Sequence, residues 1–318
     1  MTGAPPLASG SVSLRLYPHD GLDAAAIVDE MRAQAALATA CGFDGVMTSE
    51  HHNGFPGYLP NPLAAAGWCL DAMTRGWAAP CPLLLPLRET ALVAEDAAWL
   101  AARFPGRVGI GVAAGALASD FEIAGASMDG LTARFAGQLG VLAGMLSGRD
   151  LGPLHDDPAV RACVDQPIPL VSAAMGFTAV RRASALGIGL LFDSLSTPER
   201  IRELIDAYRA AGGAGACIVI RRVWIGDPPR EELARQVDRY RGYSADTAQS
   251  RWGTDELITA DDPADVVDQI VATLARAGAD AVNLRVHVPG VVSEAARDQI
   301  SRLGAGVVEP LRAGLIRR

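Results

Sequence analysis

Two histidines and a glutamate lie side by side in residues 49–53, directly after a short apolar run, 43–48. A neutral imidazole at the end of a buried strand can act as a general base near pH 7. Neighbouring side chains of a strand point to opposite faces, so at most one of His51 and His52 faces a site unless the strand has already ended. A lone histidine is more often structural, but the Glu50-His51-His52 run favours catalysis.

The same residues raise the question of a metal, since two histidines and a carboxylate are common ligands. His19 and His287, near the ends of other apolar runs, offer further ligands. Adjacent residues such as His51 and His52 rarely reach one ion together. We therefore predict no metal site.

These residues belong to a chain in which apolar runs alternate with long amphipathic segments. The expected strands are 12–17, 43–48, a third within 77–87, 108–113, 168–172, 188–192, 217–225 and 281–288. The expected helices are 22–40, one from about 61, 89–102, 131–146, 178–186, 198–211, 263–277 and 294–311.

Eight such pairs, with strands too apolar to face water, are typical of a parallel (β/α)8 TIM barrel, an α/β fold. We expect one domain over residues 1–318. A doubly wound sheet is the rival, but it would normally carry GxGxxG after its first strand, and residues 17–21 read YPHDG. In a barrel, active sites lie at the C-terminal ends of the strands.

The composition excludes several chemistries. The chain has 318 residues and a net charge of −8, and all 28 of its basic residues are arginines. Without lysine there is no Schiff-base chemistry, no pyridoxal-phosphate aldimine and no phosphate-loop NTPase motif. The net acidity argues against nucleic acid as a partner. No apolar run is long enough for a membrane span, and five scattered cysteines with no export signal predict a cytoplasmic protein.

The third expected strand has an irregular sequence, Ala-Pro-Cys-Pro, at residues 79–82. Proline removes a hydrogen-bond donor from a strand, yet a closed barrel has no edge to accommodate it. We expect a local bulge at this point, with a cis bond between Cys81 and Pro82.

Motifs along nearly the whole chain resemble those of the bacterial luciferase-like flavin monooxygenases. The motifs are Glu50-His51-His52, Asn61-Pro62, Leu85-Pro86, Ala94-Glu95-Asp96, Gly106-Arg107, Gly111, Gly115, Asp120-Phe121, Gly125, Pro169 and Gly187. The resemblance implies reduced FMN at the barrel mouth, O2 as co-substrate and a small organic substrate. It also implies a separate flavin reductase as transient supplier and a homodimer formed through the helices within 61–102. On these helices Trp68, Leu70, Leu92 and Trp99 are more apolar than a solvent face needs.

The resemblance also assigns roles to residues. His51, with Glu50 and His52 beside it, would steady the oxygenated flavin and exchange a proton with it, and the Cys81-Pro82 bond would support the flavin ring. The cofactor-binding positions implied by the family are Cys81, Pro82, Ala114, Met175, Gly176, Phe177 and Thr178.

The phosphate-binding positions depart from the family pattern. Ala114 replaces an arginine, and Met175 and Gly176 replace acidic and hydroxyl residues. The start of a helix at Phe177, with help from Thr178, still offers amides to a phosphate. Losing a charge-assisted contact costs about 1.5–3 kcal/mol, so we expect weak flavin binding.

Residues 226–259, between the seventh strand and its helix, predict a lid or insertion, because residues beyond a barrel strand lie at the catalytic face. An exposed surface helix over 230–241 is the alternative. The candidate substrate contacts are Tyr58, Arg285, His287 and Trp252. Strand alternation puts Arg285 and His287 on one face, and an inward arginine needs either a carboxylate partner or a ligand.

Two alternatives to an FMN monooxygenase stay open. One is an F420-dependent oxidoreductase of the same fold, although Ala116 lies near the place where such enzymes often have an acidic residue. The other is a flavin-free barrel, repurposed or acting as a partner subunit, which the substitutions at Ala114, Met175 and Gly176 favour.

Overall fold

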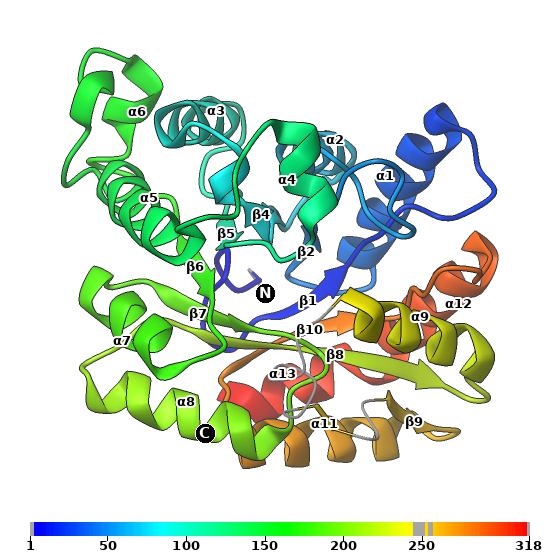
Figure 1. The fold of residues 1–318 in the computed structure, drawn as a ribbon. Coiled ribbons are helices and arrows are strands. Elements are labelled where there is room, and N and C mark those ends of the chain that lie inside the picture. Colours follow the sequence, from blue (N-terminus) through cyan, green and yellow to red (C-terminus); the bar gives the residue numbers. More distant parts are fainter. Residues whose placement is uncertain (1–2, 244–251, 254–256, 317–318) are drawn as a thin grey trace.

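The computed structural model describes residues 3–243, 252–253 and 257–316 and shows parallel strands surrounded by helices (Figure 1). The strands are β1 Val12–Arg15, β2 Gly45–Thr48, β3 Trp77–Pro80, β4 Leu83–Leu84, β5 Ile110–Ala113, β6 Leu170–Ala173, β7 Gly189–Phe192, β8 Cys217–Ile225, β9 Leu257–Ala260 and β10 Ala281–Arg285. The α-helices are α1 Ala24–Ala40, α2 Pro62–Ala72, α3 Thr90–Arg103, α4 Ala118–Ala124, α5 Leu131–Leu146, α6 Pro158–Ala162, α7 Phe177–Leu186, α8 Pro198–Ala210, α9 Arg230–Tyr243, α11 Pro263–Ala277, α12 Ser293–Gly306 and α13 Val308–Ile316. Two 3-10 turns are η1 Leu85–Leu87 and η2 Gly152–Leu154.

The sheet forms the predicted barrel. Its strands pair in parallel in the order β3-β2-β1-β10-β8-β7-β6-β5-β4. β3 and β4 are two parts of one barrel strand, interrupted at Cys81 and Pro82, whose peptide bond is cis as predicted. β3 pairs with β2 and β4 with β5, and a bridge between Ala78 and Val108 brings β3 to the segment before β5.

Helix α2 begins where its capping residue predicts, whereas the C-terminal helix differs from the prediction. The Asn61 side chain accepts a hydrogen bond from the Ala64 amide, and Pro62 opens α2. The expected single helix over 294–311 is instead two helices, α12 and α13. Pro310 cannot donate to the carbonyl of Gly306, and its ring crowds that carbonyl, so one helix cannot continue through this point.

The barrel interior is filled by apolar side chains, most of them from the strands. The cluster contains Leu7, Met47, Trp77, Ala79, Cys81, Val171, Leu191, Ala216, Ile218, Ile220 and Ala281. Gly111 of β5 permits the close approach of Cys81, because a Cβ at this glycine would lie 2.2 Å from the Cys81 sulfur. A larger cluster lies between the strands and the outer helices. Within the barrel, the filled interior leaves the mouth as the place where a ligand can bind.

The predicted insertion at 226–259 is partly regular structure. α9 occupies its first part, and β9 pairs in parallel with the C-terminal half of β8. Between them, Trp252 forms a bridge with Ser196, whereas residues 244–251 and 254–256 lie outside the described residues. Residues 230–241 are helical, as the alternative predicted, but the helix is not wholly exposed, because Gln236 and Tyr240 are buried. A lid role stays a prediction. No helix among the described residues is both long and apolar enough to cross a membrane.

Candidate functional site

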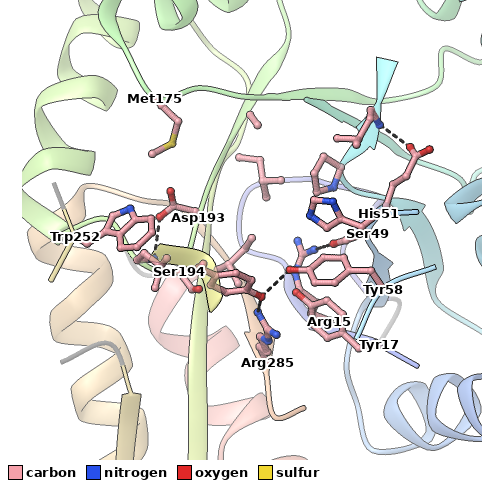
Figure 2. A pocket seen from close by; sticks show the side chains of 18 residues that line it. Arg15, Tyr17, Ser49, His51, Tyr58, Met175, Asp193, Ser194, Trp252 and Arg285 are labelled. Atoms are coloured by element: carbon pink, nitrogen blue, oxygen red, sulfur yellow. Dashed lines mark hydrogen bonds between the residues drawn. The ribbon is translucent and has the colours of Figure 1, made fainter. Parts of the chain in front are cut away.

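A cavity of about 300 Å³ opens at the C-terminal ends of the barrel strands (Figure 2). We divide its lining into three walls. The histidine wall contains Glu50, His51, Pro82 and Leu84. The arginine wall contains Arg15, Tyr17, Tyr58, Tyr240 and Arg285. The far wall, opposite His51 in Figure 2, contains Met175, Asp193 and Trp252.

His51 is the histidine that faces the cavity, and a buried aspartate fixes its ring. β2 has ended at Thr48, so strand alternation no longer dictates where the next side chains point. The Asp120 carboxylate, on α4, lies 2.7 Å from Nδ1 of His51 and accepts the His52 amide at 2.9 Å. With Nδ1 donating to a carboxylate, Nε2 is the ring nitrogen that can take up a proton.

The electrostatics of Asp120 suit this role. Burial alone would raise the pKa of the carboxyl, but hydrogen bonds from the His51 ring and the His52 amide outweigh it and lower the pKa. The carboxylate is thus ionised at neutral pH. The His51 ring is also wedged against Phe55 and Tyr58, with centroid distances of 4.6 and 4.5 Å. Position and tautomer of His51 are therefore both fixed.

Glu50 and His52 form a supporting pair behind His51. Glu50 is 1% exposed and accepts hydrogen bonds from Arg88, from the His52 ring at 3.0 Å and from the Leu84 amide at 2.7 Å. The bond to Leu84 ties the segment after β2 to β4, just beyond Pro82. Glu50 lines the cavity, whereas His52 does not, because its ring turns to Glu50.

The arginine wall holds two buried guanidinium groups. Arg15, at the end of β1, donates to Asn283 at 2.8 Å, to Ser49 and, at 3.8 Å, to the Met47 sulfur. Arg285, at the end of β10, donates from Nε to the His287 carbonyl at 3.0 Å.

Three tyrosines surround Arg285. Its guanidinium carbon lies 4.1 Å from the centroid of the Tyr17 ring, and its Nη1 donates to the Tyr240 hydroxyl at 3.2 Å. That hydroxyl is 2.7 Å from the hydroxyl of Tyr58, so α9 and the loop after β2 meet at the cavity (Figure 2). Burial would raise the pKa of Tyr17, but Arg285 and Arg15 outweigh it and lower the pKa.

His287, a predicted substrate contact, lies outside the cavity lining. β10 ends at Arg285, so the alternation that placed both side chains on one face does not extend to His287. Its ring is buried between Tyr17 and His19, with centroid distances of 5.5 and 4.5 Å. Burial, together with His19 and Arg285, lowers the pKa of His287 well below its ordinary value.

The predicted cofactor-binding residues lie in four places. Pro82 and Met175 line the cavity, Cys81 is buried in the barrel interior and Ala114 packs against the outer core. The other three line an open hollow at the start of α7. The lining of that hollow is Thr132, Gly176, Phe177, Thr178, Ala179, Arg181, Arg182 and Arg200.

The hollow carries basic side chains, although position 114 is an alanine. Arg181 and Arg182 of α7 and Arg200 of α8 all stand around it. The Arg200 guanidinium lies 4.9 Å from the Phe177 ring centroid and donates to Glu203 at 2.6 Å. Because Arg200 belongs to the next strand-helix unit, only the packing of α7 against α8 reveals its place.

Three of the four predicted substrate contacts, Tyr58, Arg285 and Trp252, line the cavity. Other residues of the arginine wall were not predicted from the sequence. Arg15, Tyr17 and Tyr240 were not singled out as site residues. Their signal was positional, since Arg15 and Tyr17 end the first expected strand, as His51 ends the second.

No three metal-binding side chains gather anywhere in the described part of the chain. His19 and His287 do pack together, but the ring nitrogens of His19 contact the Val291 carbonyl and the Gln34 amide. The His52 ring forms a hydrogen bond with Glu50. The candidate metal ligands of the sequence therefore do not converge.

Comparisons with known proteins agree with this architecture. A family model described as luciferase-like monooxygenase matches residues 13–288. An F420-dependent glucose-6-phosphate dehydrogenase from Beutenbergia cavernae is 25% identical over 260 residues, 74% of each chain.

Solved structures share the fold at low identity. Monooxygenase RslO1 from Streptomyces bottropensis has a TM-score of 0.77 at 19% identity, covering 94% of this chain and 99% of that one. The oxygenating constituent of 3,6-diketocamphane monooxygenase from Pseudomonas putida, in complex with FMN, has a TM-score of 0.72 at 17% identity, with coverages of 95% and 98%. An F420-dependent secondary alcohol dehydrogenase has a TM-score of 0.71 at 16% identity, with coverages of 96% and 99%.

Proposed function

Because this chain belongs to the luciferase-like monooxygenase family and is an oxidoreductase, we propose that it uses reduced FMN and O2 to oxygenate a small organic substrate. The observation that carries the proposal is the Asp120–His51 pair. It presents an imidazole of fixed tautomer to a cavity whose wall also contains Pro82.

The residues present fit a flavin. Leu84, Leu191 and Ile220 give the cavity apolar surface against which a planar ring can pack. The hollow at the start of α7 supplies Thr178, Arg182 and neighbouring arginines for a phosphate. We propose that reduced FMN binds across these two places and that a separate flavin reductase delivers it.

The bound flavin would supply the electrons and the position at which O2 is reduced. His51 would hold and transfer a proton at Nε2, while Asp120 stabilises the charged ring. Glu50, through Arg88 and the Leu84 amide, keeps the cavity wall in place. The apolar lining and Tyr240 of α9 would limit the access of water to the cavity.

F420 is the second candidate cofactor, because the curated relative at 25% identity is named as F420-dependent. An F420 enzyme would use the same cavity for hydride transfer and would not need O2. FMN is favoured here because Ala116, near the expected position of a proton-donating residue, has no ionisable group. Asp120 already accepts hydrogen bonds from the His51 ring and the His52 amide.

The proposal is tested by mixing the protein and reduced FMN with O2 in a stopped-flow instrument and following flavin absorbance. The wild-type protein should change the course of flavin reoxidation relative to free FMN, and His51→Ala should remove most of that change. Reoxidation indistinguishable from that of free FMN, with turnover of reduced F420 under anaerobic conditions, would instead support the F420 alternative.

A further inference from the structure

The arginine wall contains positive charge that no carboxylate balances among the described residues. Arg15 is 2% exposed and Arg285 is 3% exposed. Their hydrogen-bond partners are amide, hydroxyl, thioether and carbonyl groups, all neutral. Burying a charge without an opposite charge is costly, and natural proteins normally pair such groups.

The donors of the two arginines are not all used. Nη2 of Arg285 is buried and has no hydrogen-bond partner among the described residues. Nη2 of Arg15 meets only the Met47 sulfur, a weak acceptor, at 3.8 Å. A buried donor without a partner costs about 1–3 kcal/mol, and more when it is charged. A ligand that supplies hydrogen-bond acceptors here would therefore gain more binding free energy than it would beside donors that already have partners.

The carboxylates on the other walls have other partners. Glu50 is bound by Arg88 and the Leu84 amide. Asp193 accepts the amides of Leu195 and Ser196 at 2.9 and 2.7 Å. Neither carboxylate forms a recorded contact with Arg15 or Arg285, so the cavity has a positive side beside the histidine wall.

We propose that the arginine wall binds a carboxylate, or a similar oxyanion, of the substrate. Arg285 provides the main charge, and the hydroxyls of Tyr58 and Tyr240, which meet beside it, provide further donors. The rings of Tyr17 and Tyr58 on the same wall would pack against the hydrocarbon part. The inference rests on the proposed function and narrows its substrate to small amphipathic organic acids.

The Tyr240 hydroxyl, which now contacts Arg285 from α9, would shift to the incoming oxyanion. Guanidinium and phenol groups together match the planar, two-oxygen shape of a carboxylate. The charge-assisted contacts should make an acid bind about tenfold to a hundredfold more tightly than its neutral amide.

The test compares benzoate with benzamide by calorimetry on the cofactor-free protein. Benzoate should bind at least tenfold more tightly. Arg285→Gln should weaken benzoate about tenfold to a hundredfold and leave benzamide unchanged. Arg302→Gln is the matched control, since Arg302 lies on the exposed side of α12 and pairs with Asp298. Equal affinity for acid and amide, or binding of neither, would overturn the proposal.

Reduced flavin can also carry negative charge, so its binding to each variant is titrated separately. Arg285→Gln should leave affinity for reduced FMN within about threefold. An equal loss for reduced FMN and benzoate would assign Arg285 to the cofactor and overturn the proposal. Selective benzoate binding by a wild-type protein that binds no flavin would support the anion site while refuting the proposed function.

If Arg285→Gln fails to fold, Tyr240→Phe provides the second variant, because it removes one hydroxyl and keeps the ring. Benzoate affinity should then fall about twofold to tenfold, with benzamide unchanged. Unchanged affinity for benzoate in this variant would count against the site.

Discussion

The histidine wall and the arginine wall line one cavity, but their charged side chains have different kinds of partner. On the histidine side, Glu50 forms an ion pair with Arg88, and the Asp120 carboxylate behind His51 accepts hydrogen bonds from the His51 ring and the His52 amide. On the arginine side, Arg15 and Arg285 have only neutral recorded partners. A matched network fixes a catalytic group in place, whereas unmatched charge is suited to a ligand that brings the opposite charge.

The largest expected effect comes from removing the central group of the histidine wall. His51→Ala should lower product formation from an accepted organic acid about a hundredfold to ten-thousandfold, because proton transfer loses its positioned group. Product is quantified by mass spectrometry with reduced FMN supplied in excess. His155→Ala, at an exposed position after η2, is the control and should retain full activity. Comparable loss in both variants would remove His51 from the mechanism.

A smaller loss is expected from Asp120→Asn, which keeps the shape but removes the charge behind His51. The rate should fall about tenfold to a hundredfold with little change in KM, since Asp120 positions His51 and lies outside the cavity lining. Glu122→Gln, exposed on the same helix, serves as control. A variant altered in KM alone would contradict a positioning role.

His287, whose ring stacks on Tyr17 of the arginine wall, predicts a pH dependence of stability. Its pKa is lowered well below 6.5 in the folded protein, so the unfolded chain binds the extra proton first as pH falls. The free energy of unfolding should therefore decrease below about pH 6.5, by up to about 1.4 kcal/mol per pH unit from this group. Urea unfolding at pH 7.5, 6.5 and 5.5 measures the effect.

His287→Phe should flatten that dependence, because the ring then has no proton to gain. His155→Phe should leave the dependence as in the wild type. An unchanged slope in His287→Phe would show that another group controls the acid side of stability.

The smallest effect on the cavity is expected from the outer helices. We propose a homodimer formed through α2 and α3, where Trp68, Leu92 and Trp99 are 37%, 56% and 53% exposed. Leu70, also predicted for this face, is instead buried in the core. Leu92→Arg should halve the mass measured by light scattering at micromolar concentration and leave benzoate affinity unchanged. A wild-type mass of one chain would refute the dimer.

Thiol labelling offers a further check that the fold surrounds the cavity as described. Burial raises the pKa of Cys69, Cys81 and Cys217 to about 12, so their thiolates are scarce at neutral pH. Native protein should react slowly with a thiol reagent at these three positions, and unfolded protein rapidly. Rapid native labelling of Cys81, located by peptide mapping, would place it outside the interior.

Much of the fold was predictable because each barrel strand is a local signal. The run 217–225 is continuously apolar except for two arginines, and the structure places β8 on the same residues. The cis bond at Pro82 was also predictable, because a proline in a closed sheet needs an irregularity. By contrast, α4 and α6 were not predicted, since helices of seven and five residues are too short to show a clear period.

The site was predictable only where neighbours in the sequence are neighbours in space. His51 and Glu50 were found from one run of residues, and Asp120, which fixes His51, was noted only as part of a family motif. The Tyr58–Tyr240 contact joins residues 182 positions apart, and no local sequence pattern predicts it. The arginines around Phe177 were likewise hidden, because α7 and α8 are brought together only by packing.

The most direct test of a flavin-dependent active site is an anaerobic calorimetric titration of the wild-type protein with reduced FMN and, separately, with reduced F420. We predict saturable binding of reduced FMN that is tighter than the binding of F420. Binding should weaken when Arg182 and Arg200 are replaced by glutamine and should be retained in His51→Ala. Absence of saturable binding for both cofactors would contradict the claim that this cavity is a flavin-dependent active site.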